Sequence, residues 1–273
     1  MRSPEGLALR LLTAAVLLGA FFAALLLDRA WFVALVALLV GAGGFEWGRL
    51  AGLRPGAAGA YALCVGLLVA ALGWTLQPGG AAVEGLLAAG AVFWLFVAPA
   101  WLWRGVGVFG GAALIVSGIA VLAWAGLAAA SLSGRVLLFM LGLVWIADTA
   151  AYFAGNAFGR RKLAPSISPG KTWEGVAGAA VASLIYAIIC GMPGAPLAAL
   201  ADGAGWGAYL GAAVLLCGVS IVGDLFESAL KRRAGAKDSG GLLPGHGGIL
   251  DRIDSVMSTL PIAALMVHWS TRG

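Results

Sequence analysis

The chain is a succession of long apolar segments separated by short polar breaks. A helix needs about 20 mostly apolar residues to cross the hydrocarbon core of a bilayer. We expect a transmembrane helix in each of nine segments: 8–27, 30–49, 57–76, 81–102, 106–130, 135–156, 173–192, 205–229 and 253–270. Only Asp28 and Arg29 separate the first two segments, which indicates a tight helical hairpin. The pattern therefore predicts an all-α polytopic membrane protein with about nine spans.

Basic residues are distributed unequally between the two ends of these segments. With nine spans, 14 of the 17 lysines and arginines lie on the side of the N-terminus. Cytoplasmic loops are enriched in such residues, so we expect a cytoplasmic N-terminus and a periplasmic or extracellular C-terminus. Without the loops 157–172 and 230–252 the ratio falls to five against three, so these two loops carry most of the bias. Both loops fall on the predicted cytoplasmic face, where one site could be built from them.

The composition excludes a soluble protein. Hydrophobic residues make up 62% of the chain and charged residues 11%, with a mean hydropathy of +0.99, and a soluble fold cannot bury that much apolar surface. The net charge of +5 does not indicate nucleic-acid binding, because the cations lie in short loops beside apolar segments. Lipid headgroups and phosphorylated substrates are the expected partners there. The three cysteines lie in apolar segments, and we expect neither a disulfide nor a zinc site.

The acidic residues divide the chain into two parts. Eight of the twelve lie between Asp148 and Asp254. We therefore assign residues 135–273, with about four helices and the loops 157–172 and 230–252, to a catalytic transmembrane region. Residues 1–134, with about five helices, are expected to serve as a scaffold, in lipid contact or in oligomerisation.

Carboxylates at the ends of the last two predicted spans have the spacing of a metal site. Asp224, Ser228 and Lys231 share one face of a helix, and so do Asp251 and Asp254. A carboxylate beside the membrane needs a cation or a metal, and magnesium prefers oxygen ligands together with water and substrate phosphates. We predict Asp224 and Asp251 as primary magnesium ligands, with Asp254 second. The alternatives are a structural Asp224–Lys231 pair and helix capping by one of the other two aspartates.

A glycine-rich segment, 244–248, precedes the last predicted span. Glycine allows backbone N–H groups to approach an anion, and a helix N-terminus favours negative charge. Gly247 and Gly248 are therefore candidates for a phosphate cradle, and His246 could donate to a phosphate or orient an aspartate. An ordinary tight turn with a structural histidine is the alternative.

Basic residues lie on both sides of these aspartates. Lys231 and Arg232 follow Asp224, and Lys171 directly precedes the seventh predicted span. Phosphoryl-type transfer needs cations around the charge of the leaving group, so we assign Lys231 and Arg232 catalytic roles, with headgroup anchoring as the alternative. Asp148, within the sixth predicted span, is an intramembrane acid and hence a functional candidate.

These residues together resemble a known family. The signature of the phosphatidate cytidylyltransferases, also called CDP-diacylglycerol synthases, is matched by Ser228-x-Leu230-Lys231-Arg232-x4-Lys237-Asp238-x-Gly240-x2-Leu243-Pro244-Gly245-His246-Gly247-Gly248-Ile249-x-Asp251-Arg252-Ile253-Asp254. Segments 148–152 and 168–175 are also similar to that family. The resemblance covers residues 140–270, whereas the first half matches only in hydropathy.

The resemblance implies the reaction of CTP with phosphatidic acid to give CDP-diacylglycerol and pyrophosphate for phospholipid biosynthesis. It also implies an integral enzyme of the cell (inner) membrane with a cytoplasmic active site, magnesium dependence, a second cation such as potassium, and a homodimer. Asp224 and Asp251 match the family's metal ligands. We expect the substrates to be bound by Asn156, at the end of the sixth predicted span, and by residues of the matching segments, namely Asp148, Lys171, Ser228, Lys237, Asp238, His246, Gly247, Gly248 and Arg252.

Two other functions fit the pattern of apolar spans. A related membrane cytidylyltransferase would act on another lipid phosphate, such as an isoprenoid-ether phosphatidate. A lipid transporter would place charges near the bilayer midplane and interrupt helices in matching halves of the chain. Here the charges gather toward one predicted face, which favours an enzyme.

Overall fold

The computed structural model describes residues 4–105, 110–245 and 247–270, with side chains from residue 12 onward except residue 14. The predicted phosphate contact His246 lies outside these residues. The helices are α1 (Pro4–Leu26), α2 (Arg29–Leu50), α3 (Pro55–Thr75), α4 (Ala81–Val92), α5 (Ala98–Arg104), α6 (Gly111–Ser131), α7 (Gly134–Phe158), α8 (Trp173–Gly191), α9 (Ala198–Ala204), α10 (Trp206–Arg233) and α11 (Leu250–Ser270). A π-helical turn, Phe93–Val97, joins α4 to α5 without a break.

A helix covers most of each predicted span, so the helical membrane class holds. Within the described residues, seven helices are long and apolar enough to cross a bilayer: α2, α3, the continuous α4–α5, α6, α7, α8 and α10. The described apolar stretch of α1, Ala15–Leu26, is shorter, and α11 begins with three charges in five residues. The count of nine spans and the orientation in the membrane stay predictions.

The ends of the elements around the loops differ from expectation. Helix α10 continues to Arg233 instead of ending at 229, so Lys231 and Arg232 lie in its last turn. Basic residues at that position interact favourably with the helix dipole, whereas hydropathy marks only the apolar part of a helix. Helix α11 begins at Leu250 instead of 253, so Asp251 and Asp254 both belong to it. The predicted loop 157–172 contains two strands, β1 (Lys162–Ala164) and β2 (Ser168–Thr172).

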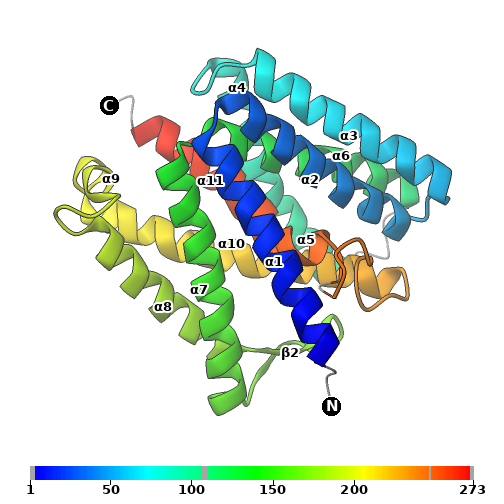
Figure 1. Cartoon of the computed structure of the whole chain (residues 1–273). Helices are drawn as coiled ribbons and strands as arrows, with labels where there is room; N and C mark the ends of the chain where they lie inside the picture. The colour runs from blue at the N-terminus through cyan, green and yellow to red at the C-terminus, as the bar shows by residue number, and fades with distance from the viewer. Residues whose placement is uncertain (1–3, 106–109, 246, 271–273) are drawn as a thin grey trace.

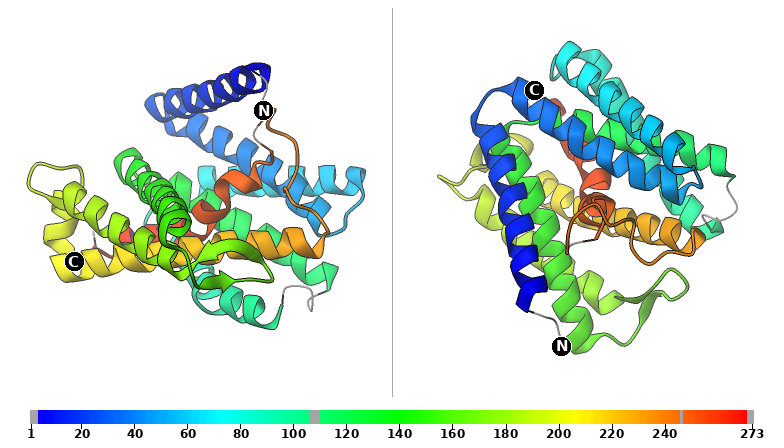
Figure 2. Two further views of the ribbon diagram at one scale, coloured as in Figure 1. Left: turned by 90° about the horizontal axis from the view of Figure 1, so that it is seen from below. Right: turned by 45° about the vertical axis from the view of Figure 1, so that its right-hand side comes forward.

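The helices form two packed pairs with α10 and α11 between them (Figure 1). Helix α2 packs on α3, and α7 packs on α8. Helix α10 contacts α8 and α11, and α11 in turn contacts α6 and α4. The N-terminal end of α1 and the β1–β2 hairpin lie at one end of the molecule, and the C-terminal end of α11 lies at the other (Figures 1 and 2).

Small residues allow the paired helices to approach closely. A Cβ atom on Gly41 of α2 would lie 3.2 Å from the carbonyl oxygen of Ala62 of α3. A Cβ atom on Gly175 of α8 would lie 2.9 Å from the carbonyl oxygen of Ala151 of α7. Association of helices in lipid relies on such close packing, since the lipid is as apolar as the side chains. The α7–α8 contact matters for function because it brings the hairpin against α7.

The base of the hairpin is held by the first turn of α8. Strand β1 pairs antiparallel with β2, with Lys162 opposite Thr172. Thr172 caps α8, its Oγ1 accepting from the amide of Gly175 at 3.1 Å. Glu174 accepts from the amides of Arg160 and Arg161 at 3.1 and 3.2 Å. These contacts fix β2 relative to α7 and α8.

Gly178→Ala is expected to lower the free energy of unfolding by about 1–3 kcal/mol, as overpacking of a filled interface does. A Cβ atom there would overlap the Cβ of Ala154 and lie 3.3 Å from the carbonyl oxygen of Ala150. The apparent melting temperature in detergent measures the effect. Gly211→Ala on α10 is the matched control, because a Cβ atom there meets nothing within 4 Å. Equal melting temperatures for the two variants would contradict the close α7–α8 packing.

Candidate functional site

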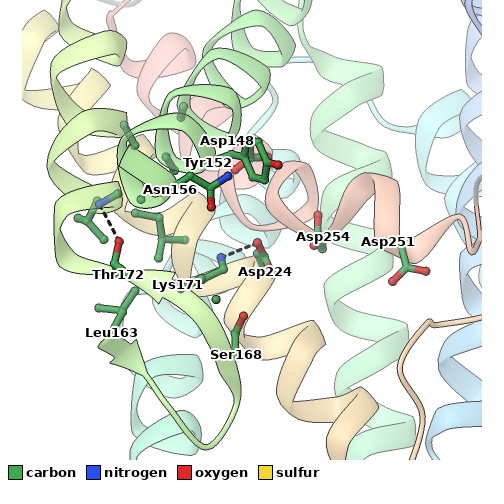
Figure 3. Close-up of a pocket in the computed structure, with 18 residues that line it drawn as sticks. Asp148, Tyr152, Asn156, Leu163, Ser168, Lys171, Thr172, Asp224, Asp251 and Asp254 are labelled. Atoms are coloured by element: carbon green, nitrogen blue, oxygen red, sulfur yellow. Dashed lines mark hydrogen bonds and ion pairs between the residues drawn. The ribbon is translucent and has the colours of Figure 1, made fainter. Parts of the chain in front are cut away.

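A cavity of about 420 Å³ lies where α7, β2, α8, α10 and α11 meet (Figure 3). Helix α7 contributes three of its polar residues, β2 three, and α10 and α11 the rest. Together the polar lining residues are Asp148, Tyr152, Asn156, Ser168, Lys171, Thr172, Asp224, Asp251 and Asp254. Segments separated by about a hundred residues thus share one polar site beside apolar helices.

Asp224 pairs with a lysine of the hairpin. The Nζ of Lys171 lies 2.5 Å from Oδ2 of Asp224, and Ser228 donates through Oγ to Oδ1 at 3.3 Å. The expected alignment of Asp224 and Ser228 on one helix face is therefore observed. The alternative Asp224–Lys231 pair is wrong, because Lys231 pairs with two other carboxylates. The hairpin, folded back against α10, supplies the cation instead.

Two further carboxylates adjoin Asp224. Asp254 interacts electrostatically with both Asp224 and Asp148. Its Oδ1 accepts from the amide of Ser255 at 2.7 Å, and no lysine or arginine within the described part of the chain forms an ion pair with it. Among the described residues that line the cavity, Lys171 is the one cation. The excess of negative charge favours binding of a further cation.

Asp251 is held by several donors at the start of α11. Its Oδ1 lies 2.6 Å from Nζ of Lys231. Its Oδ2 accepts from the amides of Ser239 and Gly248, each at 3.0 Å, and lies 3.0 Å from the hydroxyl of Ser239. In Figure 3, Asp254 lies between Asp224 and Asp251. The amide of Gly248 thus holds a carboxylate in this conformation, and its predicted contact with phosphate stays a prediction.

Lys231 lies between two acidic side chains. Its Nζ is 2.5 Å from Oε2 of Glu227 and 2.6 Å from Oδ1 of Asp251. Glu227 is fully buried and was not among the predicted site residues. The spacing of Glu227 and Lys231, four residues apart, could have indicated it, since such residues meet on a helix surface. Lys231 does not line the cavity itself, but it orients a residue that does.

The remaining predicted residues lie around the cavity rather than in it. Arg232 donates from Nε to the carbonyl oxygen of Ile167 at 3.3 Å and so ties the end of α10 to the turn of the hairpin. Lys237 and Asp238 are exposed in the loop after α10. Arg252 lies on the other face of α11, beside an apolar groove that α1 and α2 also line. Gly247 precedes α11 with a φ of +82°, a conformation that favours glycine.

A carboxylate of the N-terminal half also reaches this region, although it was not among the predicted site residues. Glu46 of α2 is 1% exposed, and its Oε2 accepts from the amide of Leu250 at 2.9 Å and from the hydroxyl of Ser239 at 3.0 Å. Glu46 lies inside an apolar span, and the rule that singled out Asp148 would have found it as well. Residues 1–134 therefore reach the loop before α11.

The carboxylate oxygens that line the cavity suit a magnesium ion that is bound together with substrate. Within the described residues, no three acidic, histidine or cysteine side chains form a group that could hold a metal alone. Magnesium usually takes one or two carboxylates and completes its shell with phosphates and water. Asp224, Asp251 and Asp254 all line the same cavity. Both oxygens of Asp224 and of Asp251 already have polar partners, so a bound ion would compete with Lys171 and Lys231 for these carboxylates. Magnesium binding at the predicted ligands stays a prediction.

The chain is similar in sequence to one family of known proteins. The cytidylyltransferase family matches residues 8–270. A phosphatidate cytidylyltransferase of Pseudomonas aeruginosa is 42% identical over 271 residues, which cover 94% of this chain and 96% of that protein. A phosphatidate cytidylyltransferase of Brucella suis is 36% identical over 226 residues, with 81% and 78% covered. One of Staphylococcus aureus is 43% identical over 131 residues, or 48% of each chain.

Proposed function

Because this chain belongs to the cytidylyltransferase family and is thus a nucleotidyltransferase, we propose that it transfers the cytidylyl group of CTP to phosphatidic acid. The products would be CDP-diacylglycerol, a phospholipid precursor, and pyrophosphate. The names of the relatives support phosphatidic acid as the acceptor. The observation that carries the proposal is the cavity that Asp148, Asp224 and Asp254 line together with Lys171, which pairs with Asp224.

The chemistry needs no covalent enzyme intermediate. An oxygen of the lipid phosphate is itself a nucleophile and would attack the α-phosphorus of CTP. The bond from that phosphorus to the oxygen bridging to the β-phosphate would break, and pyrophosphate would leave with that oxygen. The protein's task is to bring two anions together and to offset their charge, which positioned cations do effectively away from bulk water.

Lys171 is the cation best placed for this task. It lies at the end of β2, its side chain is 22% exposed, and it faces Asp224 across the cavity. A phosphate that entered the cavity would compete with Asp224 for the ammonium group. Asp148 and Asn156 line the same cavity from α7 and are the candidates for contacts with the ribose or the base.

Three aspartates are the proposed magnesium ligands. Asp224 and Asp251 would be the primary ligands, with Asp254 second, and a potassium ion is the expected second cation. Bound magnesium would offset the charge of the phosphates and orient them. Lys231 and Arg232 are then assigned to position Asp251 and the hairpin, because neither lines the cavity.

The helical membrane architecture supports a site at the membrane surface. We place the cavity on the cytoplasmic side of the cell (inner) membrane, where CTP is present, with the N-terminus on the same side. The N-terminal end of α1 and the hairpin lie at one end of the molecule, as this placement requires (Figure 1). A homodimer is expected from the family resemblance.

Incubation of the purified protein with CTP, magnesium and phosphatidic acid tests the proposal directly. We expect equal amounts of pyrophosphate and CDP-diacylglycerol. A parallel reaction with an isoprenoid-ether phosphatidate separates the related activity, and reconstituted vesicles with a labelled lipid separate a transporter. Product with the other lipid alone, or lipid movement without pyrophosphate, would overturn the proposed reaction.

Lys171→Ala is expected to lower kcat/KM for CTP about 10- to 100-fold, the loss of one charge-assisted hydrogen bond to phosphate. Lys171→Arg keeps the charge and should recover part of the loss. Steady-state kinetics with varied CTP measure both variants. Lys162→Ala, an exposed lysine on the other strand of the hairpin, is the matched control. Equal losses in Lys162→Ala and Lys171→Ala would refute a specific phosphate contact.

A further inference from the structure

Glu46 is a buried carboxylate at which two halves of the molecule meet. It lies on α2, about two hundred residues before the segment it contacts. Within the described residues no lysine or arginine pairs with it. Its Oε2 receives two hydrogen bonds, from the amide of Leu250 and from the hydroxyl of Ser239. The first of these satisfies an N–H at the start of α11, where helix amides have no partner within the helix.

Ser239 connects Glu46 to Asp251. Its hydroxyl lies 3.0 Å from Oε2 of Glu46 and 3.0 Å from Oδ2 of Asp251. The same oxygen accepts from the amide of Asp251 at 3.3 Å, and the amide of Ser239 donates to Oδ2 of Asp251. Asp251 in turn binds Lys231. A continuous chain of polar contacts therefore runs from α2 to the edge of the cavity.

The loop before α11 is shaped to admit the Glu46 side chain. A Cβ atom on Gly240 would overlap the carboxylate of Glu46. A Cβ atom on Gly248 would lie 2.6 Å from Oε2 of Glu46 and would overlap Oγ of Ser239. Both glycines belong to the segment in which Ser239 and Gly248 also donate to Asp251. Because Gly240 and Gly248 have no side chains, the carboxylate of Glu46 can lie against the loop before α11 and accept hydrogen bonds from it.

We propose that Glu46 is a positioning residue for the transfer reaction, acting through Ser239 and the first turn of α11 to orient Asp251 and Lys231. The expected effect of Glu46 on the rate of this reaction rests on the proposed function. Glu46 does not line the cavity itself, so its effect must pass through the residues it holds. Fixing a catalytic group to within a fraction of an ångström matters, because misplacement by about 1 Å can cost about 100-fold in rate.

Four variants test the proposal by kinetics: Glu46→Leu, Glu46→Gln, Ser239→Ala and the double variant of Glu46→Leu with Ser239→Ala. Glu46→Leu removes both acceptor oxygens, and we expect kcat to fall about 100-fold, the cost of a misplaced catalytic group. Glu46→Gln keeps one acceptor oxygen and should recover most of that loss. The double variant with Ser239→Ala should be no more than about twofold slower than the slower single variant, because residues that act in one chain are not additive. Wild-type kcat in Glu46→Leu, or losses that multiply in the double variant, would overturn the proposal.

Amide hydrogen exchange gives a readout that does not depend on activity. Glu46→Leu should speed exchange in residues 236–250 and leave α3, α7 and α8 unchanged. Glu84→Gln on α4 controls for removal of a carboxylate, and Val40→Ala on α2 controls for loss of packing. Neither control should change exchange in 236–250 or kcat of the folded protein. If Glu46→Leu does not fold, Glu46→Gln combined with Ser239→Ala replaces it.

The two proposals can fail separately. If the wild-type protein forms no pyrophosphate but Glu46→Leu still loosens residues 236–250, only the proposed reaction is overturned. If the wild-type protein is active and exchange in that segment is the same in Glu46→Leu, Glu46 does not position the loop and the inference is wrong.

Discussion

Asp224→Asn is expected to lower kcat for cytidylyl transfer about 100- to 1000-fold, the range for losing one preorganised electrostatic contact. Asparagine has the same shape but no charge, so it can neither pair with Lys171 nor serve as a strong magnesium ligand. Asp224 lies in the middle of the cavity between Lys171 and Asp254 (Figure 3). Its side chain is 28% exposed, so the folded state should tolerate the change.

The measurement is the rate of pyrophosphate release at saturating CTP, with titration of magnesium. The half-saturating magnesium concentration should rise as well, which a purely structural defect would not produce. Asp202→Asn, an exposed aspartate of α9, provides the matched control and should behave as the wild type. Activity of Asp224→Asn within a few-fold of the wild type would refute a metal-binding role for Asp224.

Lys231→Met should produce the largest loss of stability. Removing one partner of a buried ion pair leaves an uncompensated charge and costs about 3–5 kcal/mol. Here two carboxylates lose their cation at once, and one of them, Glu227, is fully buried. The apparent melting temperature in detergent should fall, and activity should be lost because Asp251 loses the ion pair that orients its Oδ1.

A second substitution separates stability from function. Replacing both members of a buried pair by apolar residues is often neutral for stability. We therefore expect Glu227→Met to restore much of the melting temperature of Lys231→Met without restoring activity. Arg233→Met, at the exposed end of the same helix, controls for loss of a cation. A stable and active Lys231→Met variant would show that Lys231 does not hold Asp251.

Hydropathy located the membrane helices but misplaced their ends. A helix ends where its carbonyl groups find other partners, and the basic last turn of α10 extends the helix past its apolar segment. The short strands of residues 162–172 were not predicted either. Their base is held by Glu174 of α8, which accepts from the amides of Arg160 and Arg161 just after α7, a contact between segments that hydropathy does not reveal.

Residue types alone led to the acidic and basic residues of the cavity. Charge is costly beside a membrane, so Asp148, Asp224 and Asp254 stood out against an apolar background. The cost of charge beside a membrane does not distinguish the residues that line the cavity from those that lie outside it. Arg252 and Asp254 are two positions apart, yet only Asp254 lines the cavity, because the start of α11 turns Arg252 toward the opposite side.

The amino-acid sequence by itself determined that the chain is helical and embedded in a membrane, and which family it resembles. Apolar length, charge and fixed spacing are local properties, so the order of residues is sufficient to reveal them. Only the tertiary structure decided which remote polar side chains meet: Lys171 with Asp224, Lys231 with Asp251, and Glu46 with Ser239. The pairing of buried charges depends on distances between helices remote in the chain, and packing sets those distances.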